Sequence, residues 1–394
     1  MYLHSHEKGF KMIRNNFDID VSSVKTPCFI TDERLLRRNC EILRYVQQET
    51  GCKILLAQKA FSMFSTYPLL REYLAGTTAS GLYEARLGYE EFGGEVHIFS
   101  PAFTKEDMPE ICRISDHIVF NTLSQWQQHR DTVKASGRNI SCGVRINPEY
   151  AEVETDIYNP CIAGSRMGTR AECFSGELFE GLEGIHFHTM CEQNSDVLER
   201  TLPHVIEKFD HYLKKCKWIN FGGGHHITRA DYDVEKLISC IKMMQERYDA
   251  QIYLEPGEAI ALNAGFLVTT VLDFVDNGMP AAILDASAAC HMPDVLEMPY
   301  RPHIIGSGEA GEKKYTYRLG GNTCLAGDIL GDYSFDEPLK AGDKLILCDM
   351  AIYSMVKTNT FNGMPLPDIA LHKEDGTIEV IRRFTYEDFK CRLS

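Results

Sequence analysis

The chain has 394 residues, of which 44% are hydrophobic and 25% are charged, and its formal net charge is −15. A chain of this length and composition can bury a large core without metals or disulfides, in one large domain or two ordinary ones. The acidic net charge excludes nucleic-acid binding through a basic face. Fourteen cysteines without a CxxC pair are typical of a reducing compartment, so we expect a cytoplasmic protein.

The apolar segments give no sign of a membrane span or an export signal. The start of the chain, MYLHSHEKGFKMIRNN, is polar and lacks the apolar centre of a signal peptide. The longest apolar run, residues 259–275, contains Asn263 and Asp273 and is shorter than a membrane span needs. We interpret this run as a connection followed by a strand, and we expect no membrane partner.

From residue 52 to residue 257, short apolar runs alternate with longer amphipathic segments. The runs interpreted as strands are, in chain order, KILLAQK, TTAS, VHIFS, HIVFN, CGVRIN, GIHFHT, WINFG and IYLEP. Helical periodicity is clear at 83–92, 196–216 and 233–248, and it is weakest between CGVRIN and GIHFHT. Eight strand-then-helix units predict an α/β fold, a (β/α)8 barrel of TIM type. A doubly wound sheet is the alternative, but it would require the chain to reverse direction midway.

After residue 263 the pattern changes to β-like runs separated by Gly, Pro and Asp. These runs are FLVTTVLDFV, AAILDAS, KKYTYRLGG, DKLILCD and TIEVIRRF. They predict a second, all-β domain with a sandwich or barrel structure. We place the barrel domain at residues 28–262 and the β domain at residues 263–394 together with residues 1–27. The segment TPCFITD, residues 26–32, could enter either domain.

Polar residues and glycines stand where several of the predicted barrel strands end. In a barrel of this type the chemistry lies at the carboxyl ends of the strands. The residues at these ends are Lys59, Ser80, Arg145, Asn147, His186, His188, Gly222, Gly223, Gly224 and Glu255. An amine, imidazoles, a guanidinium, a glycine turn and a carboxylate would therefore meet at one mouth of the barrel.

This combination of groups fits pyridoxal phosphate. Three glycines directly after a strand, Gly222 to Gly224, let backbone N–H groups approach a phosphate, although a tight turn explains them equally well. Lys59, which we expect to be barely hydrated, could form a Schiff base with an aldehyde, or it could reach solvent or pair with an acid. Glu255 could keep a pyridine nitrogen protonated. His186 and His188 share one face of their strand, and one of them could stack on the ring.

A metal site is the alternative use of the histidines near these strand ends. The candidates are His186, His188, His225 and His226. No acidic residue lies beside them at the usual ligand spacing, so we expect no metal.

Ten stretches between residue 55 and residue 354 match a known family. They are LLAQKAF, TASGLYEA, RINP, GSRMG, GIHFHTMCEQ, FGGGHHIT, LEPGEA, HMPDVLEMPYRP, GGNTCLAGD and DMAIYS. Through them the chain resembles the fold-type III pyridoxal-phosphate decarboxylases, which include the ornithine, arginine and diaminopimelate decarboxylases. The resemblance implies an alanine racemase-like barrel with a C-terminal β domain, and pyridoxal 5'-phosphate as the cofactor.

The resemblance also implies a cofactor site. Lys59 would hold the cofactor, His188 would stack on its ring and Glu255 would pair with the ring nitrogen. Tyr353, in DMAIYS, would reach the phosphate through its hydroxyl group. The predicted cofactor site is, in chain order, Lys59, Ser80, Arg145, His188, Gly222, Gly223, Gly224, Glu255 and Tyr353.

The loop NTCLAGD carries two further roles by the same resemblance. Cys324 would return a proton to the substrate carbon, which makes it catalytic together with Lys59, His188 and Glu255. Asp328 in the same loop would contact a substrate amine. In the family this loop comes from the neighbouring subunit, so we expect a homodimer whose active sites are shared across the interface.

One departure from the family pattern concerns the substrate. Ornithine and diaminopimelate decarboxylases usually read EPGR, where the arginine helps to hold a phosphate or a substrate carboxylate, whereas this chain reads EPGE with Glu258. An added acid suits a substrate with extra amines, and Asp285, Asp294 and Glu297 are acids in neighbouring motifs. Structural or surface roles explain these three equally well. The predicted substrate contacts are Glu258, Asp285, Asp294 and Asp328.

Together with Glu258, the resemblance implies decarboxylation of a carboxylated polyamine, carboxynorspermidine or carboxyspermidine, to the free polyamine. The alternatives are decarboxylation of diaminopimelate or another basic amino acid, racemisation on a similar barrel, and a non-catalytic carrier of the cofactor. Such a carrier would need neither the β domain nor the NTCLAGD loop. The two polyamine precursors differ by one methylene, a difference that a pocket discriminates by roughly 10–200-fold at best.

Overall fold

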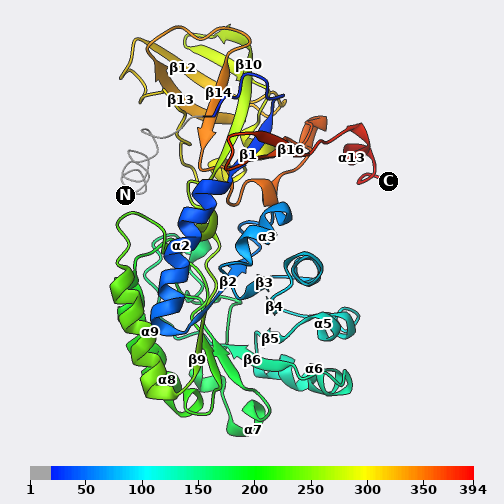
Figure 1. Ribbon diagram of the computed structural model, residues 1–394, viewed down its shortest axis with the longest axis vertical. Coiled ribbons are helices and arrows are strands. Elements are labelled where there is room, and N and C mark those ends of the chain that lie inside the picture. Colours follow the sequence, from blue (N-terminus) through cyan, green and yellow to red (C-terminus); the bar gives the residue numbers. More distant parts are fainter. Residues whose placement is uncertain (1–18) are drawn as a thin grey trace. The chain divides into compact units, whose positions relative to one another are not determined.

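The computed structural model describes residues 19–394, and the start of the chain at residues 1–18 lies outside them. The described residues form two compact units (Figure 1). The barrel unit holds Arg37–Ile260, and the sheet unit holds residues 19–36 with Ala261–Ser394. The expectation about a signal peptide rests on a segment outside the described residues.

Within the described residues, eight parallel strands of the barrel unit form a closed barrel. They are β2 (Lys53–Ala57), β3 (Gly76–Ala79), β4 (Glu95–Ser100), β5 (His117–Phe120), β6 (Ser141–Arg145), β7 (Gly184–His186), β8 (Trp218–Asn220) and β9 (Gln251–Leu254). Each strand pairs with the next, and β9 pairs with β2 to close the barrel. These strands coincide with the eight predicted ones, so the TIM-type barrel is confirmed and the doubly wound alternative is wrong.

The barrel strands are largely buried because side chains fill the barrel and helices cover its outside. Leu55, Val119, Trp218 and Tyr253 pack together as a cluster of buried side chains. They come from β2, β5, β8 and β9, which are not all neighbours, so the cluster lies in the barrel interior. This packed layer closes the inside of the barrel and leaves its chemistry to the strand ends.

Helices precede, connect and follow the barrel strands. They are α2 (Glu33–Thr50), α3 (Tyr67–Leu70), α4 (Leu82–Leu87), α5 (Met108–Ile114), α6 (Leu123–Ala135), α7 (Gly176–Phe179), α8 (Ser195–Leu213), α9 (Val234–Tyr248) and α10 (Glu258–Ala261). Between β6 and β7, where the helical pattern is weakest, the described chain has two short 3-10 turns and the four-residue α7. The loop after β6 is therefore long and irregular.

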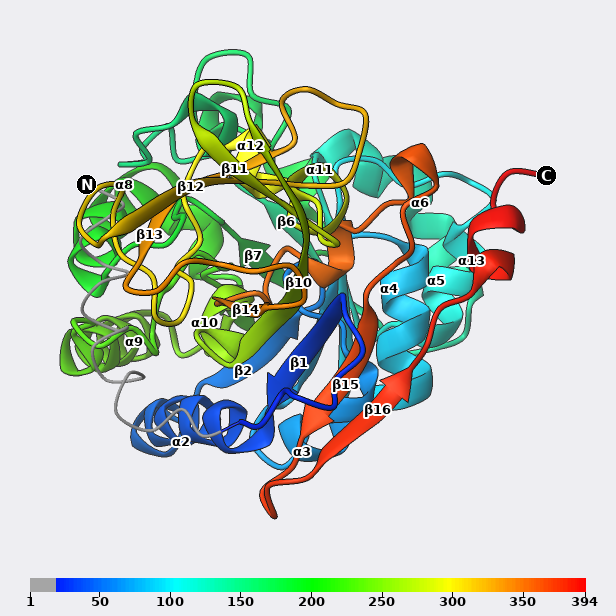
Figure 2. The ribbon, with the colours of Figure 1, turned by 90° about the horizontal axis from the view of Figure 1, so that it is seen from above.

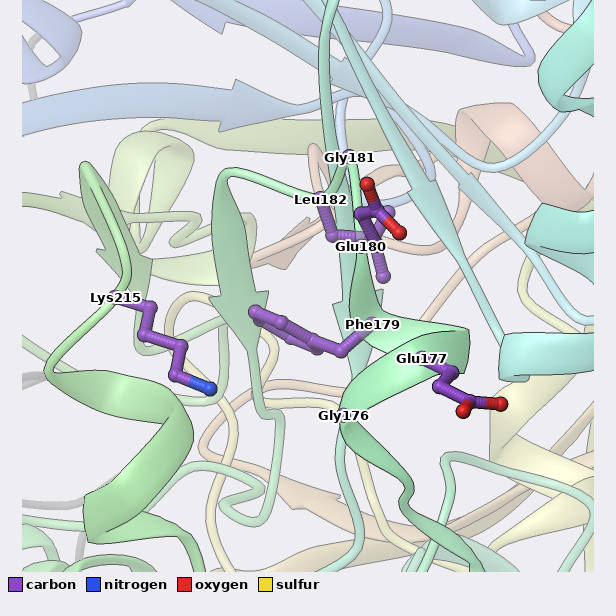
Figure 3. Close-up of a pocket in the computed structure, with 7 residues that line it drawn as sticks. All are labelled: Gly176, Glu177, Phe179, Glu180, Gly181, Leu182 and Lys215. Atoms are coloured by element: carbon purple, nitrogen blue, oxygen red, sulfur yellow. The ribbon is translucent and has the colours of Figure 1, made fainter.

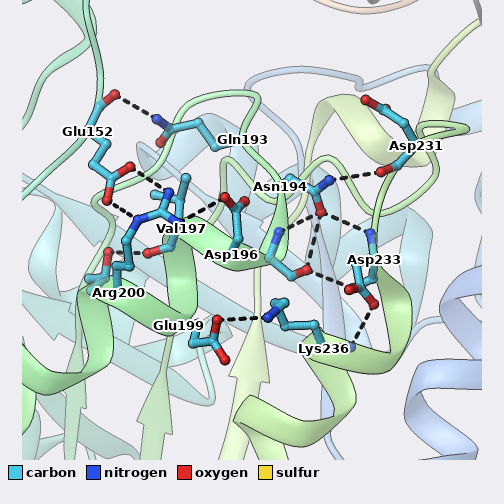
Figure 4. A network of polar contacts seen from close by, with 12 residues as sticks. Glu152, Gln193, Asn194, Asp196, Val197, Glu199, Arg200, Asp231, Asp233 and Lys236 are labelled. Atoms are coloured by element: carbon cyan, nitrogen blue, oxygen red, sulfur yellow. Dashed lines mark hydrogen bonds and ion pairs between the residues drawn. The ribbon is translucent and has the colours of Figure 1, made fainter.

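A polar network joins the starts of α8 and α9 (Figure 4). Asn194 caps α8, and its side-chain oxygen also accepts a hydrogen bond from the backbone N–H of Asp233 at 2.9 Å. Asp233 in turn caps α9 by accepting from the backbone N–H of Lys236. Glu152, in the loop after β6, pairs with Arg200 of α8 at 2.7 Å. These bonds anchor the loops that follow β6, β7 and β8.

The sheet unit contains eight strands among the described residues. They are β1 (Cys28–Asp32), β10 (Gly265–Asp276), β11 (Pro280–Leu284), β12 (Tyr315–Gly320), β13 (Ile329–Phe335), β14 (Lys344–Cys348), β15 (Asp368–His372) and β16 (Ile378–Arg382). Their order is β13-β12-β11-β10-β1-β15-β16, and β14 pairs with β10. Three short helices accompany them, α11 (Ala288–His291), α12 (Asp294–Glu297) and α13 (Tyr386–Lys390). The structure contains the β-rich unit that the sequence predicts after residue 263.

The first strand of the chain belongs to the sheet. β1 pairs antiparallel with β10 and parallel with β15 (Figure 2). The predicted boundary at residue 28 differs from this pairing, because it assigns β1 to the barrel domain. The segment TPCFITD thus enters the sheet, and the chain reaches the barrel through α2. No helix among residues 19–394 has both the length and the apolar character needed to cross a bilayer.

Candidate active site

Glu255 is the centre of a buried hydrogen-bonded group just after β9. Its carboxylate accepts a hydrogen bond from the side-chain amide of Asn220 at 2.8 Å, and its other oxygen lies 3.1 Å from Nε2 of His186. Burial alone would raise the pKa of Glu255, but the interactions with His186 and Asn220 outweigh burial and lower it. Burial lowers the pKa of His186. We therefore assign an ionised Glu255 and a neutral His186 that donates its Nε2–H.

His188 is held in one tautomer by the glycine turn after β8. The backbone N–H of Gly223 donates to Nδ1 of His188 at 2.8 Å, so the ring hydrogen resides on Nε2. Burial lowers the pKa of His188 well below its usual value, and the positive charges of Lys59 and Arg145 lower it further. The ring is therefore neutral, and its orientation is fixed by the backbone.

The glycine turn, Gly222 to Gly224, has no room for side chains. Gly222 and Gly224 have φ angles of +69° and +81°. A Cβ atom on Gly224 would lie 2.0 Å from the carbonyl oxygen of Met190, and one on Gly223 would lie 2.5 Å from that of Glu255. Glycine is required here because both the backbone conformation and the close approach of neighbouring strands exclude any larger residue.

The N–H groups of this turn do not all face outward, which limits the phosphate site predicted from it. The Gly222 N–H donates to the side-chain oxygen of Asn220 at 2.8 Å, and the Gly223 N–H is bonded to His188. The Gly224 N–H has no acceptor in the part of the chain that the structure describes. The three-residue cradle is thus reduced to one open donor, because the first two N–H groups order the site itself.

Arg145 is a buried cation at the end of β6. Its guanidinium donates to the carbonyl oxygen of His188 at 3.2 Å and lies over the ring of Phe99 at 4.7 Å. No carboxylate of residues 19–394 comes within 4 Å of it. Burial lowers the pKa of Arg145 to about 10, so it remains charged at neutral pH. A buried cation without an ion-pair partner suits a site that receives an anion.

Lys59 lies in the turn after β2, which ends at Ala57. Its neighbours Gln58 and Ala60 are fully buried, but the Lys59 side chain is exposed. The side chain as a whole is therefore more exposed than the sequence predicts, because the strand ends two residues before it. Protein atoms nevertheless surround the amine, and this burial lowers the pKa of Lys59, which the charge of Arg145 lowers further.

Two residues outside the predicted set belong to this site. Asn220 orders both Glu255 and the glycine turn, and Glu84 is close enough to Lys59 for each charge to affect the pKa of the other. Burial raises the pKa of Glu84, whose carboxylate accepts from the N–H of the exposed Ser80 at 2.6 Å. The sequence signals that could have identified these two residues are an Asn directly before FGGG and a Glu four residues after Ser80.

Glu258 begins α10, directly after the loop that follows β9, and that loop packs on the loop of Lys59. A Cβ atom on Gly257 would lie 2.6 Å from Cβ of Ala60, so the two loops pack closely. One carboxylate oxygen of Glu258 lies 3.7 Å from Nε2 of His226, which follows the glycine turn. The loops after β2, β8 and β9 therefore place an acid beside the amine-bearing loop.

The predicted substrate contacts in the sheet unit have other partners. The Asp285 carboxylate accepts hydrogen bonds from the hydroxyls of Thr26 and Thr269 and from the backbone N–H of Thr270. These bonds satisfy both of its oxygens and join β11 to β10, so they account for Asp285 without a substrate amine. Asp294 pairs with Lys357. These contacts fit the structural roles that the sequence left open for Asp285 and Asp294.

Asp328 organises the loop that carries Cys324. Its buried carboxylate accepts from the hydroxyls of Ser287 and Thr323 and from the N–H of Ala289. The Cys324 side chain is exposed. Asp328 thus closes the loop on itself within the sheet unit, and the thiol is presented to solvent.

Tyr353 also lies in the sheet unit, after β14. It has a φ angle of +51°, which is unusual for a residue with a large side chain. Such strain persists where the surrounding structure fixes the backbone, and it is common at functional positions. Its predicted phosphate contact stays a prediction.

A surface hollow in the barrel unit lies away from these residues. It has a volume of about 440 Å³ and lies beside α7, just before β7 (Figure 3). Its lining consists of Gly176, Glu177, Phe179, Glu180, Gly181, Leu182 and Lys215. None of the predicted site residues lines it, so we do not assign it to the reaction.

Comparison with known proteins gives the family. The model of the family described as "Pyridoxal-dependent decarboxylase, C-terminal sheet domain" matches residues 21–351. Carboxyaminopropylagmatine decarboxylase of Synechocystis sp. is 44% identical over 375 residues, covering 95% of this chain and 96% of its own. Carboxynorspermidine/carboxyspermidine decarboxylase of Campylobacter jejuni subsp. jejuni is 41% identical over 380 residues, covering 94% and 98%.

A solved structure gives the same result. The crystal structure of carboxynorspermidine decarboxylase complexed with norspermidine from Campylobacter jejuni superposes with a TM-score of 0.88 at 40% identity. It covers 94% of this chain and 100% of its own. Diaminopimelate decarboxylase from Helicobacter pylori, at 17% identity and a TM-score of 0.81, shares the fold. The chain therefore belongs to the family of pyridoxal-dependent decarboxylases, whose cofactor is pyridoxal 5'-phosphate.

Proposed function

We propose that this enzyme decarboxylates carboxynorspermidine and carboxyspermidine to norspermidine and spermidine. The observation that carries the proposal is Glu258, an acid directly after the loop that packs on the Lys59 loop. A polyamine precursor has ammonium groups that a carboxylate can bind, whereas diaminopimelate has a second carboxylate that an acid repels. Relatives at 34–44% identity include decarboxylases named for carboxylated polyamines.

The residues of the barrel unit fit pyridoxal phosphate. The Lys59 side chain is exposed, Glu255 is a buried carboxylate, and the Gly224 N–H has no acceptor among residues 19–394. Lys59 would hold the aldehyde carbon, Glu255 the ring nitrogen and Gly224 the phosphate. When bound, the cofactor supplies an electron sink for the pair left by departing carbon dioxide.

The protein side chains then have separate tasks. His188, neutral and fixed by Gly223, would cover one face of the ring without adding charge. Arg145 would attract the anionic groups of cofactor and substrate into the site. Glu258 would hold a distal ammonium group, and Asp328 and Asp294 remain predicted amine contacts. Ser80 and Tyr353 remain predicted cofactor contacts.

We infer a homodimer in which Cys324 serves the active site of the partner subunit as proton donor. The exposed thiol lies on an ordered loop. The backbone N–H of Cys324 donates to the side-chain oxygen of Asn362 at 2.7 Å, which fixes the position of this residue. Next to Asn362 is a hollow of about 590 Å³ lined in part by Phe361 and Leu393, which are half or more exposed. Such apolar exposure is typical of a surface that another chain covers.

Mixing two inactive variants tests the shared site. Lys59→Ala and Cys324→Ala proteins, each inactive alone, should regain up to about a quarter of wild-type activity when their subunits exchange, because one of the two sites in a mixed dimer is intact. Activity that stays absent after exchange is verified would overturn the shared site. A cytoplasmic location is our further proposal, supported by fourteen free cysteines.

Turnover on a substrate panel tests the proposed function. Carbon dioxide release should be fastest with carboxynorspermidine or carboxyspermidine and at least about tenfold slower in kcat/KM with diaminopimelate, ornithine and arginine. A preference for diaminopimelate would contradict the role of Glu258. Inversion of the substrate carbon without release of carbon dioxide would identify a racemase.

A second candidate substrate is carboxyaminopropylagmatine, because the relative at 44% identity is named for it. This compound ends in a guanidinium group where the polyamine precursors end in an ammonium group. A carboxylate can bind a guanidinium through two parallel hydrogen bonds. Including it in the same panel decides between the two, since the better substrate has the higher kcat/KM.

A further inference from the structure

A group of three potential metal ligands lies at the amino ends of two barrel strands, away from the strand ends that carry Lys59 and Glu255. Glu95 and His97 are on β4, and His117 begins β5. Glu95 and His97 are two residues apart, so their side chains share one face of the strand. His97 and His117 are direct neighbours in the register of β4 and β5. We call these three residues the barrel-floor cluster.

The ligand atoms of the barrel-floor cluster are close together. One side-chain nitrogen or oxygen from each residue lies within 4.8 Å of the other two. Nε2 of His97 is 3.0 Å from a carboxylate oxygen of Glu95, and the His97 and His117 rings stack with centroids 4.0 Å apart. Two residues on one strand and one on the next is an arrangement that can surround a single ion.

The two imidazoles have nitrogens without hydrogen-bond partners. Nδ1 of His97 and Nδ1 of His117 are buried, and neither has a partner among the described residues. His97 is only 1% exposed. A buried polar atom without a partner is unfavourable, so native proteins rarely retain one without a use. Nε2 is the His97 nitrogen that faces Glu95, so an ion shared by these two residues would replace their hydrogen bond. The unpartnered Nδ1 of His117 offers a lone pair that the protein leaves unused.

Lys53 is the cation that now balances Glu95. It pairs with the carboxylate, and its side chain is 40% exposed at the start of β2. The hydroxyl of Tyr253 donates to the same carboxylate at 3.1 Å. A long, solvent-accessible lysine can leave Glu95 at small cost, because an ion pair at the surface contributes little to stability. Lys53 therefore competes with a metal ion for this carboxylate but does not block it.

We propose that the barrel-floor cluster binds a divalent transition-metal ion, Zn²⁺ or Cu²⁺, through one oxygen of Glu95 and one nitrogen each of His97 and His117. Imidazole and carboxylate ligands favour these ions over Mg²⁺ and Ca²⁺, which prefer oxygen ligands alone. Binding would turn one imidazole out of the present stack so that both lone pairs face the ion. Water would complete the coordination. The site is separate from the decarboxylation chemistry and does not depend on the proposed substrate.

Copper binding to the purified holoenzyme tests this site. One Cu²⁺ per chain should bind, and its electron paramagnetic resonance spectrum should show coupling to two nitrogens. His117→Asn should remove one nitrogen from the spectrum and weaken binding at least tenfold. His211→Asn changes an exposed histidine outside the cluster and should change neither. Lys53→Met should tighten binding several-fold, because it removes the competing cation.

Two results would overturn the proposal. One is a wild-type protein that binds no stoichiometric Cu²⁺ or Zn²⁺. The other is a two-nitrogen signal that survives in His117→Asn and disappears in His225→Asn, which would place the ion among the histidines near the glycine turn. If His117→Asn does not fold, Glu95→Gln tests the same site. It removes the anionic ligand and should weaken Zn²⁺ binding at least tenfold, while the Cu²⁺ spectrum should still show coupling to two nitrogens.

Discussion

Nε2 of His186 lies 3.1 Å from the carboxylate of Glu255, although His186 ends β7 and Glu255 follows β9, two strands that are not neighbours in the barrel. Asn220, from the strand between them, donates to the other oxygen of the same carboxylate. The acid is therefore fixed from two sides by groups that are themselves buried. This arrangement keeps Glu255 ionised at the point where the sequence predicts a partner for the cofactor nitrogen.

Glu255→Gln should reduce kcat/KM on the order of 10²-fold, because it removes the negative charge opposite the ring nitrogen but keeps the size of the side chain. Steady-state decarboxylation at neutral pH is the measurement. Glu255→Asp is the matched control, since it keeps the charge on a shorter side chain and should lose less. Equal activity of Glu255→Gln and wild type would contradict the role of this carboxylate.

The same residue predicts a pH dependence of stability. The folded-state pKa of Glu255 is lowered from 4.5 to about 2, so its contribution is fully present above about pH 4.5 and is lost as the pH falls toward 2. The difference in unfolding free energy between wild type and Glu255→Gln should therefore shift in favour of wild type between pH 3 and pH 6. Denaturant unfolding at several pH values measures it, and a difference that does not change with pH would contradict the lowered pKa.

Lys59→Ala should abolish the covalent attachment of the cofactor. Purified wild type should show an absorbance band near the visible edge that disappears on borohydride treatment, and the variant should show no such band. Activity should fall by roughly 10²–10⁴-fold, the range found for a single catalytic side chain. Lys236→Ala, on the outer surface of α9, is the control and should keep both band and activity.

Gly224→Ala should destabilise the protein by about 1–3 kcal/mol and weaken cofactor binding, because the new Cβ would meet the carbonyl oxygen of Met190 and the φ angle is positive. Gly176→Ala is the matched control, since nothing lies within 4 Å of its Cβ position. Thermal unfolding and cofactor titration measure both effects. Similar behaviour of the two variants would show that the turn tolerates a side chain.

Glu258→Gln should raise KM for a polyamine precursor by roughly 10–100-fold, the equivalent of about 1.5–3 kcal/mol for a hydrogen bond to a charged group. The value of kcat should change little, because the distal ammonium group is held equally in the ground and transition states. Glu199→Gln, an exposed acid paired with Lys236, is the control. A fall in kcat with unchanged KM would assign Glu258 to the chemistry instead of to binding.

Asp285→Asn should lower the unfolding free energy by about 1–3 kcal/mol, because it disturbs the bonds from Thr26, Thr269 and Thr270. Its KM should match that of wild type. Chemical unfolding together with steady-state kinetics separates the two effects. A raised KM at unchanged stability would restore the substrate role predicted for this acid.

The sequence predicted the barrel because its strands are short, apolar and regularly spaced. It did not predict β13 or β15. β13 contains Gly331 and Asp332, and β15 begins with Asp368, residues that are usually depleted in strands. β1 was ambiguous because a strand that pairs with partners more than 200 residues away leaves no local signal of which sheet it joins.

The limits of the site prediction have a similar cause. Lys59, His188 and Glu255 lie at the ends of predicted strands, so their common location could be read from the sequence. The hydrogen bonds that occupy Asp285, and the two N–H groups that the glycine turn uses internally, depend on tertiary contacts. Asn220 was overlooked because an amide has neither the charge nor the nucleophilicity that marks a candidate residue.

The carboxylate of Asp328 has a kinetic consequence. It draws together Ser287, Ala289 and Thr323, so the loop with Cys324 has its shape before another molecule arrives. Ordering a free loop would cost about 1–2 kcal/mol per residue in backbone entropy. The loop loses this entropy when the sheet unit folds. A molecule that binds at the Cys324 loop would therefore meet a preformed surface, and its binding would not require the loop to fold.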